Sequence, residues 1–394
     1  MAYRLNPLVE TVAAAPIAEA QGWVRGRRFP ADRPLLDCAQ AVPSYPPAEE
    51  LTRHLAEAVQ RPETAFYTDI LGREDLRAAL AAHLSIAYEG AVSADQIGIT
   101  AGCNQAFCLA ATSIAGAGEE VILPLPYYFN YQMWLEMLGV SVVPLAVGED
   151  DALPDPDAAA RLITSGTRAI GLISPNNPTG ATYPAELIEA FYRLAQRHGI
   201  ALVLDETYKD FRLDRGPAHR LFQDPDWPGT LVQLYSFSKA YSLTGYRVGA
   251  LAAGKPLLEA LAKAMDCVAI CAPNIGQEAA LFGIEHLAEW REAKRRLMLG
   301  RLDALRSAFQ ANALRYRLIS AGAFFAWVRH PFVGEPAATV ARRLADRQNL
   351  LCLPGTIFGP GQEGVLRLAF ANLPAEAMAE VVGRLMASQD DLHD

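Results

Sequence analysis

The sequence predicts an α/β fold, in which a mostly parallel central sheet carries helices on both faces and a smaller α+β domain follows. In the middle of the chain, short apolar runs alternate with amphipathic segments of helix length. Strand, helix and strand in repetition are typical of a parallel sheet, whose ligands lie at the carboxyl ends of its strands. After Gln277 the pattern changes to a long, charged helical stretch followed by short strands and further helices.

Each element is predicted from its hydrophobic pattern. Strands are expected at residues 121–123, 141–145, 169–173, 200–204, 231–235 and 248–252. Helices are expected between them at residues 105–114, 185–198 and 256–265. In the C-terminal part, we expect helix over 278–312 and short strands around 324–327 and 365–370. The alanine-rich stretch 11–20 predicts an amphipathic helix, because Glu10 and Glu19 bracket it too closely for a secretion signal.

The change of pattern near Gln277 also predicts the domain division. We expect residues 46–277 to form a large, ligand-binding domain. Residues 1–45 and 278–394 are expected to form the small domain, so the N-terminal segment would fold back onto the C-terminal part. Pro43, Pro46 and Pro47 make a plausible linker between the two.

Composition excludes several function classes for this chain of 394 residues. The net charge is -9 and no basic stripe stands out, which argues against nucleic acid as a partner. Six cysteines are scattered without a C-x-x-C pair, so we expect free thiols in a reducing, cytoplasmic compartment and no structural metal. No apolar run reaches the ~18 residues of a membrane span.

The segment from Ser236 to Arg247 is the most informative stretch of the chain. It follows an apolar run that predicts a buried strand, and it brings hydroxyl groups, the amine of Lys239 and the guanidinium of Arg247 into one turn-rich segment. That combination suits a phosphorylated aldehyde such as pyridoxal phosphate. The lysine can form an imine with the carbonyl carbon, while the hydroxyls and the arginine hold the phosphate. A lysine alone would not be evidence, because most lysines are solvated surface groups.

Two further motifs follow predicted strands. The turn Ser174-Pro-Asn-Asn-Pro-Thr-Gly180 displays Asn177, although such residues also make plain loops. Asp205 stands where the next strand ends, and Tyr208 follows it. A carboxylate there can pair with a protonated ring nitrogen, and the tyrosine can donate to a phenolic oxygen; the alternative for Asp205 is a simple helix N-cap.

Two weaker signals lie earlier in the chain. Gly102, Cys103 and Asn104 precede a predicted helix, where small residues let backbone N–H groups approach an anion or merely cap the helix. Tyr128 follows a predicted strand, where an aromatic side chain can stack on a flat ring or pack in the core.

Taken in order, these segments resemble the class I/II aminotransferases of the fold-type I pyridoxal-phosphate enzymes, over about residues 36–371. The resemblance implies a role for each predicted residue. Lys239 is similar to the Schiff-base lysine, Asp205 to the ring-nitrogen partner, Tyr208 and Asn177 to the donors for the ring hydroxyl oxygen, and Tyr128 to the stacking aromatic. The phosphate site is matched by Ser236, Ser238 and Arg247 with Gly102, Cys103 and Asn104.

The resemblance also implies substrate contacts and a partner. Arg367 matches the arginine that grips the substrate carboxylate, with Asn177 and the backbone at Ala41 nearby, although many relatives have glycine in place of Ala41. Tyr67 matches a tyrosine that reaches the phosphate of the neighbouring subunit, which implies a homodimer with shared sites.

The implied activity is transfer of an amino group between an L-amino acid and a 2-oxo acid by a ping-pong mechanism, with pyridoxal 5'-phosphate as cofactor. The same motifs would also serve a lyase, a decarboxylase or a cyclase-type enzyme. A non-enzymatic, aminotransferase-like sensor is a further alternative, but the chain offers no basic recognition helix before Tyr67. Asn104 and Cys267 stand where aspartate-active relatives carry cations, which argues mildly against a dicarboxylic substrate.

Overall fold

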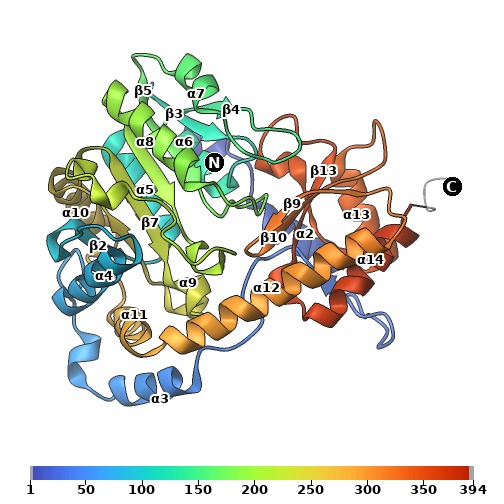
Figure 1. Ribbon diagram of the computed structural model, residues 1–394, viewed down its shortest axis with the longest axis horizontal. Coiled ribbons are helices and arrows are strands. Elements are labelled where there is room, and N and C mark those ends of the chain that lie inside the picture. The colour runs from blue at the N-terminus through green and yellow to red at the C-terminus, as the bar shows by residue number, and fades with distance from the viewer. Residues whose placement is uncertain (1–2, 390–394) are drawn as a thin grey trace.

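The computed structural model describes residues 3–389, which are arranged around two main sheets (Figure 1). The larger sheet has seven strands. In sheet order they are β2 (Ile97–Thr100), β8 (Gly249–Ala252), β7 (Leu231–Ser236), β6 (Ala201–Asp205), β5 (Thr167–Ile173), β3 (Glu120–Pro124) and β4 (Ser141–Leu145). Strands β4, β3, β5, β6 and β7 are parallel, and β8 runs antiparallel to both β7 and β2. The predicted fold class is therefore confirmed.

The six strands predicted for this sheet are all present, with bounds within two residues of the expected ones. Strands β5 to β8 are almost wholly buried because helices cover both faces, and this explains their continuous apolar runs. Strand β2 was not predicted, since its four residues between polar segments are too few to show a period.

Helices surround this sheet on both sides. They are α3 (Glu49–Ala58), α4 (Glu74–Ala87), α5 (Cys103–Ile114), α6 (Phe129–Met137), α7 (Pro156–Leu162), α8 (Ala185–His198), α9 (Phe237–Ala240), α10 (Lys255–Ala269) and α11 (Asn274–His286). Helix α8 has the predicted bounds and ends at Gly199, whose φ of +63° suits glycine.

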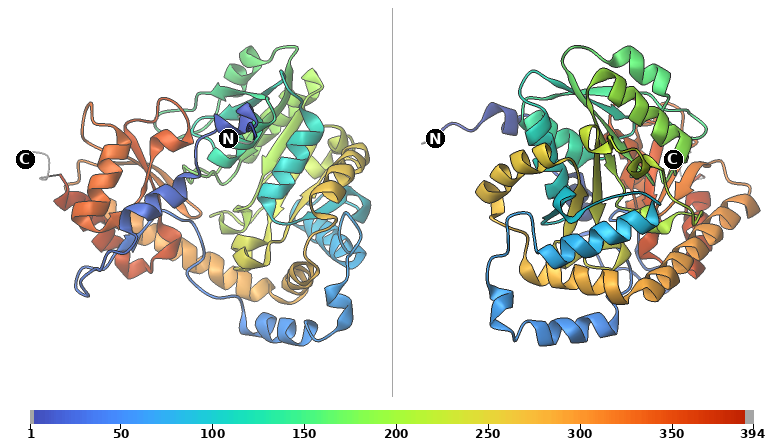
Figure 2. Two further views of the ribbon diagram at one scale, coloured as in Figure 1. Left: turned by 180° about the vertical axis from the view of Figure 1, so that it is seen from behind. Right: turned by 60° about the vertical axis from the view of Figure 1, so that its left-hand side comes forward.

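The smaller sheet contains β12 (Leu353–Pro354), β13 (Val365–Ala369), β10 (Phe325–Arg329) and β9 (Arg317–Gly322), all antiparallel. Beside it, β1 (Leu36–Asp37) pairs in parallel with β11 (Leu350–Leu351). Helices α2 (Pro16–Val24), α13 (Ala337–Gln348) and α14 (Met378–Ala387) complete this part, while the short α1 (Pro7–Glu10) lies near α6. The stretch from α2 to β1 thus lies on the C-terminal part of the chain, whereas α1 contacts α6 beside the larger sheet (Figure 2).

Two helix predictions needed correction. The helix expected over 11–20 begins only at Pro16, whose ring suits the first helical position. The stretch 278–312 forms two helices, because α11 ends at His286 and α12 (Ala288–Ala311) follows Leu287 in a new direction. Helix α12 then runs across to the small sheet (Figure 1). Among residues 3–389, no helix is long and apolar enough to cross a membrane.

Candidate active site

A cavity of about 320 Å³ lies at the carboxyl ends of β5, β6 and β7. Parallel strands end at one edge of a sheet, so residues far apart in the sequence meet there. The cavity lining includes most of the predicted site residues: Ala41, Cys103, Asn104, Tyr128, Asn177, Asp205, Tyr208, Ser236, Ser238, Lys239, Arg247 and Arg367. Gly102 lies directly behind it, whereas Tyr67 does not line it.

Asp205, the last residue of β6, is buried at the floor of the cavity. Its Oδ1 accepts a hydrogen bond of 2.8 Å from the Thr207 amide, and its Oδ2 accepts one of 2.6 Å from the Tyr131 hydroxyl. The Cys103 thiol points at Oδ1 from 3.6 Å. Burial raises the pKa of Asp205, and the hydrogen bonds from these neighbours oppose that shift. The site therefore holds a carboxylate whose charge depends on its donors.

Lys239 lies on α9, directly after β7. Its Nζ donates a hydrogen bond of 2.7 Å to the backbone oxygen of Ala41. Burial, together with the charges of Arg367 and Arg247, lowers the pKa of Lys239 to about 8. A sizeable fraction of this amine is thus neutral near physiological pH, as a nucleophile or general base requires.

Residues at the start of α9 and at the start of α5 line the cavity together. Ser236 caps α9 by accepting from the Ser238 amide at 3.3 Å. Arg247 has a left-handed backbone (φ +50°) and donates to the backbone oxygens of Thr244 and Ala101. A side chain on Gly102 would overlap the Arg247 guanidinium, so only glycine permits this approach.

Arg367 lies on β13 of the small sheet and is buried. Its Nη1 donates to Asn177 Oδ1 at 3.0 Å and its Nη2 donates to the backbone oxygen of Ala39. The guanidinium lies between the rings of Phe325 and Phe358, 5.0 Å from each centroid. Burial lowers the pKa of Arg367 to about 10, so it stays charged at neutral pH. Among the described residues its buried Nε has no hydrogen-bond partner.

The remaining predicted residues frame the cavity. Asn176 holds the turn that carries Asn177 by accepting from the Thr179 amide and hydroxyl. Tyr208 is buried against Phe325, and Tyr128 forms another wall. Sequence reasoning did not select several lining residues, namely Ile17, Gln40, Val42, Ile173, Thr207 and Thr244. Only Thr207 and Thr244 carried a signal, since each is a hydroxyl residue inside a motif already identified.

Tyr67 lies outside the cavity, with 75% of its surface exposed, next to Phe66 at 64%. Large aromatic side chains are rarely so exposed together without a partner. Residues 3–389 contain no group of three or more His, Cys, Asp or Glu side chains that could hold a metal ion.

This cavity, in this α/β fold, is typical of enzymes that hold a small ligand with a lysine and other buried charged side chains. Residues 34–385 match the family described as aminotransferase class I and II, and the chain belongs to that family. It is a transaminase, an enzyme that exchanges an amino group between an amino acid and a 2-oxo acid.

Similar proteins agree with this assignment. Aromatic aminotransferase ISS1 of Arabidopsis thaliana is 28% identical, over 91% of this chain and 90% of its own length. Arginine–pyruvate transaminase AruH of Pseudomonas aeruginosa is 30% identical over 81% of both chains. A solved aspartate aminotransferase of Thermus thermophilus with maleate superposes with a TM-score of 0.88 at 25% identity, covering 98% of this chain and 99% of the other. These names span three kinds of amino donor, so the family sets the reaction rather than the substrate.

Proposed function

We propose that the cavity binds pyridoxal 5'-phosphate through Lys239 and uses it to transfer amino groups by a ping-pong mechanism. The observation that carries the proposal is the placement of a partly neutral lysine amine in one cavity with a buried carboxylate and a guanidinium-lined recess. When bound, pyridoxal phosphate withdraws electrons from the α-carbon of an amino acid. The residues present fit this group in charge, size and donor set.

Each end of the cavity suits one end of the cofactor. The recess made by Ser236, Ser238, Arg247 and the first turn of α5 (Gly102, Cys103 and Asn104) suits the phosphate, because it offers hydroxyls, a guanidinium and backbone amides. Asp205 suits the ring nitrogen, because its negative charge favours the protonated ring. Tyr208 and Asn177 are proposed to donate to the ring hydroxyl oxygen, and Tyr128 to cover the ring face.

The substrate would lie between the two sheets. Arg367 is proposed to bind the α-carboxylate with the two Nη nitrogens now bonded to Asn177 and Ala39. This fixes the α-carbon relative to Lys239, whose amine then removes the α-proton of the amino acid in one half-reaction and delivers a proton to the α-carbon of the new amino acid in the other. The backbone oxygen of Ala41 accepts from Lys239, and we propose that the substrate binds on this side of the lysine.

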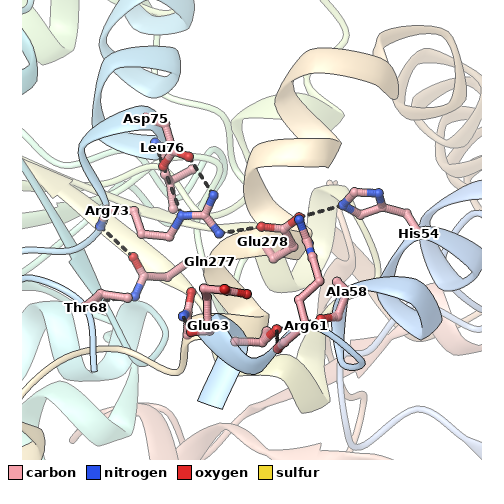
Figure 3. A network of polar contacts seen from close by, with 12 residues as sticks. His54, Ala58, Arg61, Glu63, Thr68, Arg73, Asp75, Leu76, Gln277 and Glu278 are labelled. Atoms are coloured by element: carbon pink, nitrogen blue, oxygen red, sulfur yellow. Dashed lines mark hydrogen bonds and ion pairs between the residues drawn. The ribbon is translucent and has the colours of Figure 1, made fainter. Parts of the chain in front are cut away.

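We further propose that the enzyme is a homodimer in which Tyr67 completes the partner's phosphate site. Support comes from a cluster of ion pairs around the buried Glu278, which holds the segment around Tyr67 (Figure 3). Glu278 of α11 contacts Arg61, Arg73 and His54, the last at 2.8 Å. Although burial opposes it, hydrogen bonds from these basic side chains lower the pKa of Glu278 to about 2.

Neighbouring side chains of α11 bind the same segment. Gln277 accepts from the Arg73 amide at 2.8 Å and donates to the Thr68 hydroxyl at 2.9 Å (Figure 3). Asn274 donates to the backbone oxygen of Glu63 at 2.9 Å. The exposed segment is therefore rigidly presented, as a surface built for a second copy of the chain requires.

The domain division stays a proposal, with one refinement. Ala279, Ala280 and Leu287 pack in the core of the large sheet, which supports a boundary at Leu287 rather than after Gln277. Residues 1–2 and 390–394 of the proposed small domain lie outside the described residues. A cytoplasmic location is also proposed, supported by six cysteines that are all free thiols.

The test is borohydride trapping of the purified protein with pyridoxal phosphate, followed by peptide mapping. The label is expected on Lys239, and Lys239→Ala should lose both the label and transamination. A label on another residue, or a fully active Lys239→Ala variant, would contradict the proposal. Formation of a new amino acid only when a 2-oxo acid is added separates a transaminase from a lyase, which would release ammonia without an acceptor.

A further inference from the structure

Tyr131 is a buried tyrosine that touches the site without lining the cavity. It lies on α6, and only 3% of its surface is exposed. Its hydroxyl donates to Asp205 Oδ2 at 2.6 Å, and Asp205 lines the cavity whereas Tyr131 does not. The hydroxyl of Tyr131 therefore reaches the cavity lining through its bond to Asp205.

The ring of Tyr131 is held firmly by its neighbours. It stacks on Phe107 of α5, with ring centroids 3.5 Å apart and planes within 5°. The ring of Tyr128 meets it edge to face, with ring centroids 5.4 Å apart. Cys103 and Phe107 are one turn apart on α5, so a single helix face supplies both the thiol aimed at Asp205 and the ring that fixes Tyr131. The hydroxyl direction is thus set by packing.

The Tyr131 hydroxyl affects the charge of Asp205, because Asp205 is buried. Burial favours the neutral acid, and the hydrogen bonds from Tyr131 and Thr207 are what oppose it. Thr207 contributes its backbone amide, which is retained with any side chain, and its hydroxyl and the Cys103 thiol also oppose the shift. Burial raises the pKa of the Cys103 thiol and of the Tyr131 hydroxyl. Both groups therefore stay protonated and can donate to Asp205. Lys239 faces it from α9, with Tyr128 and Tyr208 further round the cavity.

We propose that Tyr131 is a positioning residue for the reaction, which keeps the Asp205 carboxylate ionised and turned toward the cofactor ring. This inference rests on the proposed function, since it assigns to Asp205 the ring-nitrogen contact. It goes further by placing control of that contact in a side chain that no ligand touches.

The test compares Tyr131→Phe with Tyr235→Phe. Both variants keep the ring and lose a buried hydroxyl bonded to an aspartate, but Tyr235 donates to Asp210, at 2.8 Å, away from the cavity. The affinity of the cofactor-free protein for pyridoxal phosphate is measured at pH 6 and pH 8, with kcat and KM for one amino acid and the unfolding temperature of each variant without cofactor.

For Tyr131→Phe we expect weaker cofactor binding, by about tenfold at pH 6 and less at pH 8. Loss of the donor raises the pKa of Asp205 further, so the neutral acid persists to higher pH. We expect kcat to fall by about tenfold while KM changes less than about twofold, because Arg367 is untouched. Tyr235→Phe should show neither the pH trend nor the kcat loss.

The proposal is wrong if Tyr131→Phe matches Tyr235→Phe, or if its affinity loss is the same at both pH values. Phe107→Leu provides a second test that leaves the hydroxyl in place. It should give a smaller loss with the same pH trend, and a loss without that trend contradicts the proposal. If the wild-type protein does not bind pyridoxal phosphate at Lys239, the proposed function itself fails; if it does, only the role of Tyr131 is in question.

Discussion

Two clusters of buried charge in this molecule behave in opposite ways. Around Glu278, a carboxylate is surrounded by three basic side chains, and its pKa falls to about 2. Around Asp205 and Lys239, burial dominates instead, so the pKa of the acid rises and that of the amine falls to about 8. The first cluster is complete within the chain, whereas the second leaves Arg367 Nε unsatisfied among the described residues.

The difference separates structural charge from functional charge. The side chains of a fully paired cluster hold the backbone in place, and few of their donors and acceptors remain for a ligand. A cluster with shifted pKa values and free donors can bind a ligand of matching charge and move protons near neutral pH. Residue type alone does not distinguish the two, since both use carboxylates and guanidinium groups.

Asp205→Asn should show the largest effect. The amide keeps the size of the side chain but cannot supply a negative charge to a protonated ring, so kcat should fall by at least about 10²- to 10³-fold, with a much smaller loss of cofactor affinity. Steady-state kinetics and cofactor titration measure the two. Equal losses of kcat and of cofactor affinity would contradict the proposed role of the Asp205 charge.

Arg367→Lys should come next. A lysine keeps the charge but not the fork, so kcat/KM for an amino acid should fall by about 10²-fold, mostly through KM. Arg73→Lys in the Glu278 cluster is the matched control and should leave KM unchanged. A similar loss in both variants would mean that Arg367 acts only on stability.

Glu278→Gln should act on stability instead. Loss of the charge weakens its bonds to Arg61, Arg73 and His54, and we expect unfolding to become easier by about 1–3 kcal/mol at pH 7. Because the pKa of Glu278 is lowered in the folded state, its contribution is present above the unfolded value near 4.5 and disappears as the pH falls toward 2. Urea unfolding of both proteins at pH 7 and pH 3 should show the difference narrowing; an unchanged gap would argue against the ion cluster.

The pH dependence of Lys239 gives the smallest effect. Since its folded pKa of about 8 lies below the ordinary value, the rate at which the cofactor-free protein takes up pyridoxal phosphate should rise with pH and level off above about pH 8. Because the pKa of Lys239 is lower in the folded state, the free energy of unfolding should also increase as the pH rises from 8 toward 10.5. Stopped-flow absorbance measures the uptake, and a rise that continues to pH 10 would contradict the lowered pKa.

Much of the fold could be predicted because buried parallel strands leave apolar runs in the sequence. Strand β4 and helix α8 have the predicted bounds. Strand β2 and the break at Leu287 could not be predicted, because a four-residue strand and a one-residue break have no periodicity. Asp205, Ser236 and Lys239 were found because they stand at or just after the end of a predicted strand. Arg367, Tyr67 and Ala41, in contrast, were selected only through the family resemblance.

The contacts within the site could not be predicted from the sequence in the same way. The bond from Tyr131 to Asp205 joins residues 74 positions apart, and no local pattern encodes it. The same holds for the rings of Phe325 and Phe358 that enclose Arg367, which come from a strand and a turn of the small part. Such contacts depend on how the two sheets meet rather than on any single element.

The short stretch after β1 has a consequence for every molecule that enters the cavity. The backbone oxygens of Ala39 and Ala41 accept hydrogen bonds from Arg367 and Lys239, the two cations proposed to hold substrate and cofactor. An incoming ligand must share these cations with the peptide oxygens or displace them. Occupancy of the site is thereby linked to the path of the main chain near residue 40, whatever side chains that stretch carries.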